Sequence, residues 1–276
     1  MSGAEGATTA AAPQRRNSQV PDEFNHAILN EVAHRPWGMP TRPWVMTQTW
    51  HSLLFAHWAV APDIMRRLVP AAFEVDLFDG RAWVGIVPFY MTNVAPRFVP
   101  ALPWVSEFPE LNVRTYVRVG DRPGVFFFSL DAGSALAVHT ARTLLNLPYF
   151  SASMTVTPRT GGIAYESRRD ASGRPAEFRA VYGPAGEVFT AARGSLEYFL
   201  TERYCLYHLT RRGRPYRLEI HHPPWPLQPA QADVSRNTMA DVNGLTLPAG
   251  PPLLHFSQRQ DVVTWSPSRV RAVGPT

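Results

Sequence analysis

The sequence contains no lysine, because all 27 of its basic residues are arginine. The chain therefore carries no side-chain primary amine. It also has a single cysteine, Cys205, which excludes an intramolecular disulfide and is typical of a reducing compartment, so we expect a cytoplasmic protein. No apolar run approaches the roughly eighteen residues of a membrane-spanning helix, and the sequence predicts no membrane association.

The common motifs of nucleotide and hydrolase chemistry are absent as well. The chain has no G-x-G-x-x-G, Walker loop, G-x-S-x-G, H-E-x-x-H or C-x-x-C. These absences exclude a standard nucleotide-binding fold and a serine hydrolase, and we expect no cofactor.

The nine histidines show no spacing that is typical of a metal site. His51 and His57 fall on the same side of one predicted strand, but six residues of strand separate them by roughly 20 Å. His221 and His222 are adjacent, so in an extended segment they point to opposite faces. We therefore predict no bound metal. The histidines are expected to be ordinary surface or capping residues.

The net charge of +5 does not indicate nucleic acid, because the arginines are spread along the whole chain without a long run. Residues 1–20 are small and polar and lack an apolar segment, so they predict a disordered tail and no signal peptide. The remaining residues, 21–276, show no clear linker and predict one domain. A homo-oligomer is compatible with this chain.

Composition and pattern predict a mainly β protein with a few short helices. Apolar residues make up 45% and charged residues 18% of a chain with 27 prolines and 15 phenylalanines. Short alternating runs joined by turns dominate, for example a predicted hairpin over 73–96 around Asp79-Gly80. Helices are expected at 21–33, 62–69 and 196–204. This pattern favours an antiparallel sheet that closes or folds over on itself.

The most distinctive stretch runs from Glu107 to Phe150 and predicts strand, turn, strand and helix. Leu111, Val113, Thr115, Val117 and Val119 alternate with polar residues along its first strand. The polar row contains Glu110, Asn112, Arg114 and Tyr116. Either this row faces solvent, as in many antiparallel sheets, or it forms the wall of a pocket.

Charge on this stretch suits a small acidic or carbonyl ligand. Glu110 and Arg114 share one face of the strand, and an arginine fork binds a carboxylate with two hydrogen bonds. Arg142 lies in the predicted helix among leucines and is a further pocket candidate. Alternatively, Arg142 forms a salt bridge, or it lies at the surface with its aliphatic stem over apolar neighbours.

Several motifs together resemble one bacterial family. They include Pro109–Val117, Gly124–Asp131, Ala141-Arg142, Leu147–Phe150, Asp79–Val84, Ser195–Tyr204 and the run His222-Pro-Pro-Trp-Pro226. From Trp44 to Trp265 the chain is similar to the YqjF-like family of uncharacterised bacterial proteins, domain of unknown function 2071.

The resemblance extends to the acetoacetate decarboxylase superfamily, which implies a curved antiparallel sheet that closes into a barrel-like cone around a small-molecule pocket. In the decarboxylase a lysine that follows a proline forms a Schiff base with the substrate. At the matching place, after Pro148, this chain has Tyr149 and Phe150. The resemblance also implies that Glu110 is a pocket carboxylate.

A Schiff base requires a primary amine, so the amine route of that superfamily is excluded on this alignment. We therefore predict a small-molecule-binding protein whose ligand is a carboxylate or carbonyl compound. The pocket candidates are Glu110, Asn112, Arg114, Tyr116, Arg142 and Tyr149. The first alternative is an acid/base enzyme of isomerase or lyase type that acts on an oxo acid, with Glu110 and Tyr149 moving protons. The second is a structural or interaction protein without a ligand.

Overall fold

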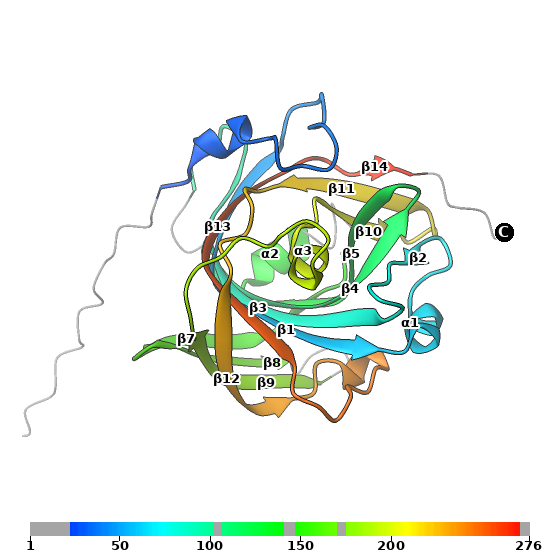
Figure 1. The fold of residues 1–276 in the computed structure, drawn as a ribbon. Coiled ribbons are helices and arrows are strands. Elements are labelled where there is room, and N and C mark those ends of the chain that lie inside the picture. Colours follow the sequence, from blue (N-terminus) through cyan, green and yellow to red (C-terminus); the bar gives the residue numbers. More distant parts are fainter. Residues whose placement is uncertain (1–22, 102–105, 141–146, 170–174, 271–276) are drawn as a thin grey trace, which may run out of the picture.

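The computed structural model describes residues 23–101, 106–140, 147–169 and 175–270 (Figure 1). The elements, in chain order, are η1 (His26–Asn30), β1 (Met46–Val60), α1 (Pro62–Leu68), β2 (Glu74–Val75), β3 (Ala82–Pro96), β4 (Phe108–Val119), β5 (Arg122–Ala132), α2 (Ala135–Thr140), β6 (Tyr149–Ser151), β7 (Ser153–Arg159), β8 (Gly162–Arg169), β9 (Ala176–Pro184), α3 (Leu196–Thr201), β10 (Cys205–Leu209), β11 (Pro215–His221), β12 (Gln228–Asn237), η3 (Asp241–Asn243), β13 (Leu253–Thr264) and β14 (Ser268–Arg269). The prediction of a mainly β protein with a few short helices is confirmed.

The strands close into a ring. The order β11-β10-β5-β4-β3-β1-β13 is completed where β13 pairs back onto β11, at Ile220 with Thr264 and His221 with Val263. Figure 1 looks into this ring. Most neighbours are antiparallel, as expected, but β10 pairs with β5 and β5 with β6 in the parallel sense.

A second layer formed by β12, β9, β8 and β7 continues from β13 and lies below the ring in Figure 1. Its apolar face packs against the outer side of the ring. Leu111 and Val113 of β4 belong to the same core cluster as Tyr165 of β8 and Phe178 of β9. The apolar side chains of the two sheet layers thus pack against each other, and each layer contributes one row of side chains to the thickness of the core.

Strand β4 is consequently covered on both faces. Its apolar row meets the second layer, and its polar row points the other way, into the ring. Glu110 and Asn112 are each 4% exposed, Arg114 is 9% exposed, and Tyr116 is fully buried. The interpretation of this row as a solvent-facing side is therefore wrong.

The predicted hairpin over 73–96 is only partly right. Asp79 and Gly80 form the turn with positive φ angles, but it is closed by a single bridge from Phe78 to Arg81. Strand β2 pairs with the end of β4, not with β3. The reason is that β3 pairs with β4 only as far as Val84 with Thr115, which leaves that edge of β4 free for β2 at Val117 and Arg118.

The helices are shorter than predicted. The expected helix over 21–33 is a single 3-10 turn, η1, and the helix over 196–204 ends at Thr201. Beyond α3 the Glu202 carboxylate accepts hydrogen bonds from the Tyr204 hydroxyl and from the Trp225 backbone N–H. These contacts hold Glu202 outside the helix, with φ of -83° and ψ of 69°, so the helix ends at Thr201.

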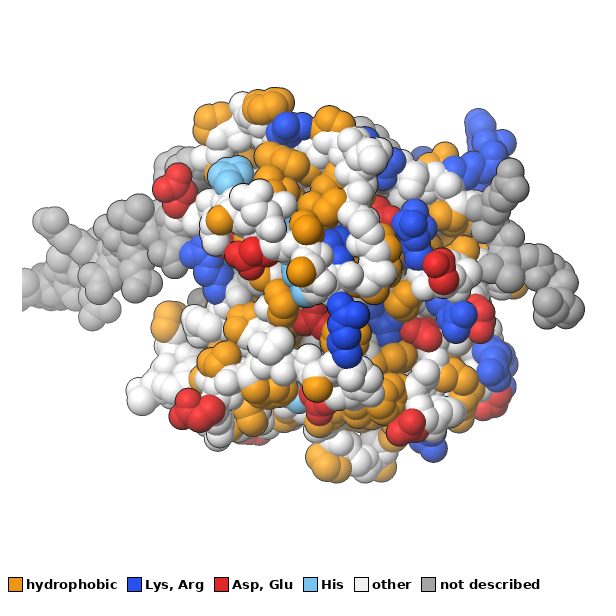
Figure 2. Space-filling model, turned by 45° about the horizontal axis from the view of Figure 1, so that its top comes forward, with side chains coloured by type: hydrophobic (Ala, Val, Ile, Leu, Met, Phe, Trp, Pro, Cys, Tyr) orange, Lys and Arg blue, Asp and Glu red, His pale blue; other side chains and the backbone are white. Residues whose placement is uncertain are grey.

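Helix α3 lies across the opening of the ring in Figure 1. Its residue Leu200 is fully buried with Leu130, Leu147, Leu206 and Leu218 in one cluster. None of the described helices has the length and apolar character needed to cross a bilayer. On the face in Figure 2, hydrophobic, basic and acidic side chains are interspersed.

Candidate functional site

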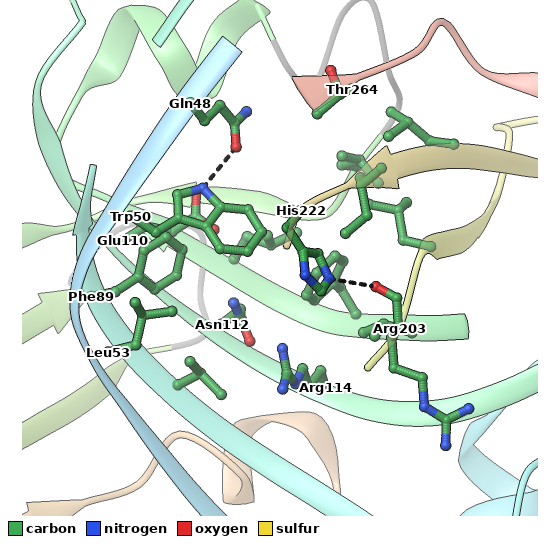
Figure 3. Close-up of a pocket in the computed structure, with 18 of the residues that line it drawn as sticks. Gln48, Trp50, Leu53, Phe89, Glu110, Asn112, Arg114, Arg203, His222 and Thr264 are labelled. Atoms are coloured by element: carbon green, nitrogen blue, oxygen red, sulfur yellow. Dashed lines mark hydrogen bonds between the residues drawn. The ribbon is translucent and has the colours of Figure 1, made fainter. Parts of the chain in front are cut away.

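A cavity of about 110 Å³ lies inside the ring (Figure 3). It is lined by apolar side chains from several strands and by a smaller polar set. The lining residues are Met46, Gln48, Trp50, Leu53, Val87, Phe89, Glu110, Asn112, Arg114, Val125, Phe127, Leu130, Leu147, Tyr149, Thr201, Arg203, Cys205, Leu206, Leu218, Ile220, His222, Trp225 and Thr264.

The structure brings four of the six predicted pocket residues to this cavity, namely Glu110, Asn112, Arg114 and Tyr149. The first three are successive inward-pointing residues of β4, which is why strand alternation places them side by side. Tyr149 comes from β6, beyond β5. Arg142 lies outside the described residues.

Glu110 and Tyr149 form a carboxyl–phenol pair. The Tyr149 hydroxyl donates to Oε2 of Glu110 over 2.8 Å. The pKa of Glu110 is raised to about 8. Burial is the main cause, the hydrogen bond from Tyr149 opposes it, and the nearby charge of Asp131 adds to it. Burial and the Glu110 charge also raise the pKa of Tyr149 well above its ordinary value. At neutral pH both groups therefore hold their protons.

The Asp131 charge that acts on Glu110 is itself part of a buried ion pair. Asp131 Oδ2 lies 3.1 Å from Nε of Arg169, and neither side chain is exposed. Arg169 also stacks over the Phe150 ring at 4.2 Å. This pair lies between the ring and the second layer and links β5 to β8.

Arg114 and Asn112 bring polar atoms that the described part of the chain does not satisfy. Arg114 Nη2 donates to the Leu200 carbonyl at 3.2 Å, and its guanidinium stacks on Phe55 at 5.3 Å. Its Nε, and Oδ1 of Asn112, are buried without a hydrogen-bond partner among the described residues. Buried polar atoms are rarely left unpaired, so these two atoms mark a polar spot on the cavity wall.

Tyr116 does not line the cavity, although it belongs to the same row. Its hydroxyl donates to the Leu200 carbonyl at 2.8 Å and lies 2.6 Å from Nε2 of His57. Since the hydroxyl proton goes to the carbonyl, His57 Nε2 must be the donor in the second contact. Burial and the positive charge of Arg114 lower the pKa of His57, which stays neutral. Tyr116 thus fastens α3 to β4.

Several cavity residues were missed by sequence reasoning. Trp50 and Trp225 stack at a centroid distance of 6.0 Å, and His222 lies beside them. Figure 3 shows His222 with its hydrogen bond to the Arg203 carbonyl, 3.3 Å long. The signal was the run His222-Pro-Pro-Trp-Pro226, which the prolines keep extended across the ring. Burial lowers the pKa of His222 to about 4, so it is a neutral wall of the cavity.

Neither a metal nor a reactive thiol is indicated in the described part of the chain. No group of three or more histidine, cysteine, aspartate or glutamate side chains there has metal-binding geometry. Cys205 lines the cavity, but burial and the charge of Glu219 raise its pKa to about 12, so its thiol is unreactive. Glu110, Tyr149, Asn112 and Arg114 place a carboxyl, a phenol, an amide and a guanidinium on the wall of a largely apolar cavity.

Solved structures define the class of fold. An acetoacetate decarboxylase-like enzyme from Sphingomonas wittichii RW1 matches with a TM-score of 0.56 and 13% identity, over 87% of this chain and 98% of that one. The acetoacetate decarboxylase of Legionella pneumophila matches with 0.57 and 13%, over 91% and 98%. The enduracididine biosynthesis enzyme MppR, complexed with a condensation product of pyruvate and imidazole 4-carboxaldehyde, matches with 0.58 and 12%, over 86% and 92%. The chain therefore has an acetoacetate decarboxylase-like fold.

Sequence comparison then gives the family. Residues 47–261 match the model of domain of unknown function 2071, described as an uncharacterised conserved protein. The chain is also 48% identical to the uncharacterised protein YqjF of Bacillus subtilis strain 168 over 227 residues, which are 82% of this chain and 93% of that protein. The chain belongs to this family, and the predicted resemblance is confirmed.

Proposed function

We propose that the ring cavity binds a small molecule with an apolar body and a carboxylate or carbonyl group. The observation that carries the proposal is the enclosure of Glu110, Tyr149, Asn112 and Arg114 in one largely apolar cavity. A few convergent polar groups in an apolar hollow are typical of ligand sites. Because the chain has no lysine, the ligand is held without a Schiff base to a lysine amine.

Charge favours an acceptor-rich ligand. With Glu110 protonated, Arg114 is the cation of the polar set, and Glu110 and Tyr149 hold O–H groups there. A ligand carboxylate or carbonyl oxygen would accept from Arg114, and a ligand donor would satisfy Oδ1 of Asn112. A molecule with both groups fits the unpaired atoms on this wall.

A thermal-shift experiment with a small library of 2-oxo, 3-oxo and simple carboxylic acids tests this proposal. We expect some members to raise the melting temperature of the wild type, and the Glu110→Gln variant to change that response. Glu166→Gln, at an exposed ion pair on β8, is the control and should respond like the wild type. No stabilisation by any member, or an identical response in Glu110→Gln, would overturn the proposal.

A second candidate function, acid/base catalysis on an oxo acid, is favoured by one observation. The Glu110 carboxyl has a pKa of about 8 and contacts a phenol, and a pKa near working pH is what a general acid or base requires. Deuterium exchange of the protons next to the ligand carbonyl, followed by proton NMR in D₂O, tests it. Stabilisation without exchange or product would leave binding as the function.

The proposal includes a cytoplasmic location. It is supported by the absence of any disulfide partner for Cys205, the one cysteine of the chain, whose side chain is buried.

A further inference from the structure

A second polar site lies on the outer face of β11, away from the cavity. Leu218 and Ile220 line the cavity, so Glu219 between them points to the opposite face of the strand. There a hollow of about 290 Å³ is lined by backbone and side chains of 38–42 and by Arg122, Arg217, Glu219 and Ser268.

Glu219 is the centre of a group of arginines from three separate segments. Its Oε1 lies 2.8 Å from Nε of Arg217 on β11 and 3.2 Å from Nη1 of Arg122 on β5. Its Oε2 lies 3.6 Å from Nη2 of Arg35 and accepts from Trp37 Nε1 at 3.0 Å. The carboxylate is 3% exposed, so it is the buried counter-ion of this cluster.

The charges in this cluster do not balance. Arg35, Arg122 and Arg217 surround one carboxylate, and Arg42 joins Arg122 and Arg217 in the lining of the hollow. Glu219 is the one acidic residue among the described residues that line the hollow. Burial lowers the pKa of Arg35, with Glu219 opposing that shift, and the Arg122 charge lowers it too. The positive charges of these arginines repel one another at close range, and an additional anion would reduce that repulsion.

The donors that remain point to where that anion would sit. Arg35 is held in the interior, stacked over Tyr204 at 4.8 Å. Arg122 and Arg217 have side-chain exposures of 35% and 19%, so part of each guanidinium faces the hollow. Nε of Arg42 is buried and has no hydrogen-bond partner among the described residues. Planar guanidinium groups bind phosphate and carboxylate oxygens in pairs.

We propose that the hollow on the outer face of β11, lined by Arg42, Arg122 and Arg217, binds a compact oxyanion, that is, a phosphate or carboxylate group. Glu219 orients the arginines and at the same time competes with the incoming anion for them. The site is separate from the ring cavity because the two lie on opposite faces of one strand.

Titration with inorganic phosphate and, separately, with acetate in chloride buffers of matched ionic strength tests this site. We expect the wild-type melting temperature to rise by a few degrees at saturation, and the tighter anion identifies the group. Arg122→Gln should weaken the response at least tenfold in concentration. The control Arg179→Gln removes an exposed arginine from a carboxylate pair on β9 and should respond like the wild type.

Glu219→Gln gives a result that a purely structural cluster would not produce. Removing the competing carboxylate should make the anion bind more tightly, by about tenfold, even if the variant is less stable. Glu110→Gln should leave the phosphate response unchanged, which separates this site from the cavity. The proposal is overturned if neither anion raises the wild-type melting temperature above the chloride control. It is also overturned if Arg122→Gln keeps the wild-type concentration dependence.

Discussion

The Tyr149 hydroxyl of β6 reaches past β5 and lies 2.8 Å from the Glu110 carboxylate of β4. Leu130 and Ala132 of β5 pair with Tyr149 and Glu110, respectively, so the contact spans the strand that separates them. Glu110 raises the pKa of Tyr149, whereas the hydrogen bond from Tyr149 lowers the pKa of Glu110 and opposes the effect of burial. This pair makes the cavity wall polar without making it charged.

Glu110→Gln should stabilise the protein at alkaline pH. The folded-state pKa of Glu110 is about 8 against an ordinary value of 4.5. Between these values the folded state keeps a proton that the unfolded state has lost, so wild-type stability falls as pH rises. The stability falls by about 1.4 kcal/mol per pH unit, and the loss between the two pKa values is on the order of 5 kcal/mol in all. Urea unfolding at pH 5 to 8.5 measures it. Parallel curves for the wild type and Glu110→Gln would contradict the shifted pKa.

Tyr149→Phe should raise the pKa of Glu110 above about 8. The phenol donates to the carboxylate and is the contact that opposes the burial shift, so its loss leaves the ionised form less stabilised. Carboxyl ¹³C NMR of labelled glutamate follows this titration. Tyr216→Phe, which removes a partly buried hydroxyl on β11, serves as the control and should leave the titration in place. An unchanged or lowered Glu110 pKa in Tyr149→Phe would be inconsistent with the pair.

Asp131→Asn should have two separate effects. It leaves the buried Arg169 guanidinium without this carboxylate, which should lower the free energy of unfolding by about 3 kcal/mol. It also removes a negative charge that raises the Glu110 pKa, so that pKa should fall. Asp63→Asn at the exposed pair with Arg67 should change stability by less than about 0.5 kcal/mol. Equal losses in the two variants, or a Glu110 pKa that rises, would refute this assignment.

Gly124→Ala should destabilise the seam between β5 and β10. A Cβ at Gly124 would lie 2.7 Å from the Tyr207 ring and 2.8 Å from the backbone oxygen of Cys205, and backbone cannot move aside easily. We expect a loss of about 1–3 kcal/mol in chemical unfolding. Gly38→Ala is the matched control, since nothing lies within 4 Å of its Cβ. If both alanines are tolerated equally, the strands are not packed this closely.

The period-two pattern in the sequence was sufficient to locate β4, because alternation depends only on local backbone geometry. Whether the polar row that contains Glu110 faces solvent or a cavity could not be derived from the alternation. A polar row looks the same in sequence whether it faces water or a cavity, and only closure of the ring by β13 decides between them. The pairing of β2 with β4 depends on which strand edges are already occupied, which is also a property of the assembled sheet.

The position of Tyr149 came from the resemblance to the family, not from periodicity, and its contact with Glu110 needed the coordinates. Trp225 and His222 were visible as a proline-rich run, but a run of prolines gives an extended backbone without saying what it crosses. The hollow around Glu219 gave no sequence signal, since Arg35, Arg122 and Arg217 are far apart along the chain.

The pairing of β13 with both β1 and β11 has a consequence for biosynthesis. During translation, β1 emerges from the ribosome some two hundred residues before the strand that covers its free edge. Until Thr264 has left the exit tunnel, the inner wall stays open and its tryptophans and phenylalanines are accessible to chaperones and to other nascent chains. The cavity inside the ring can therefore form only after β13 has been synthesised.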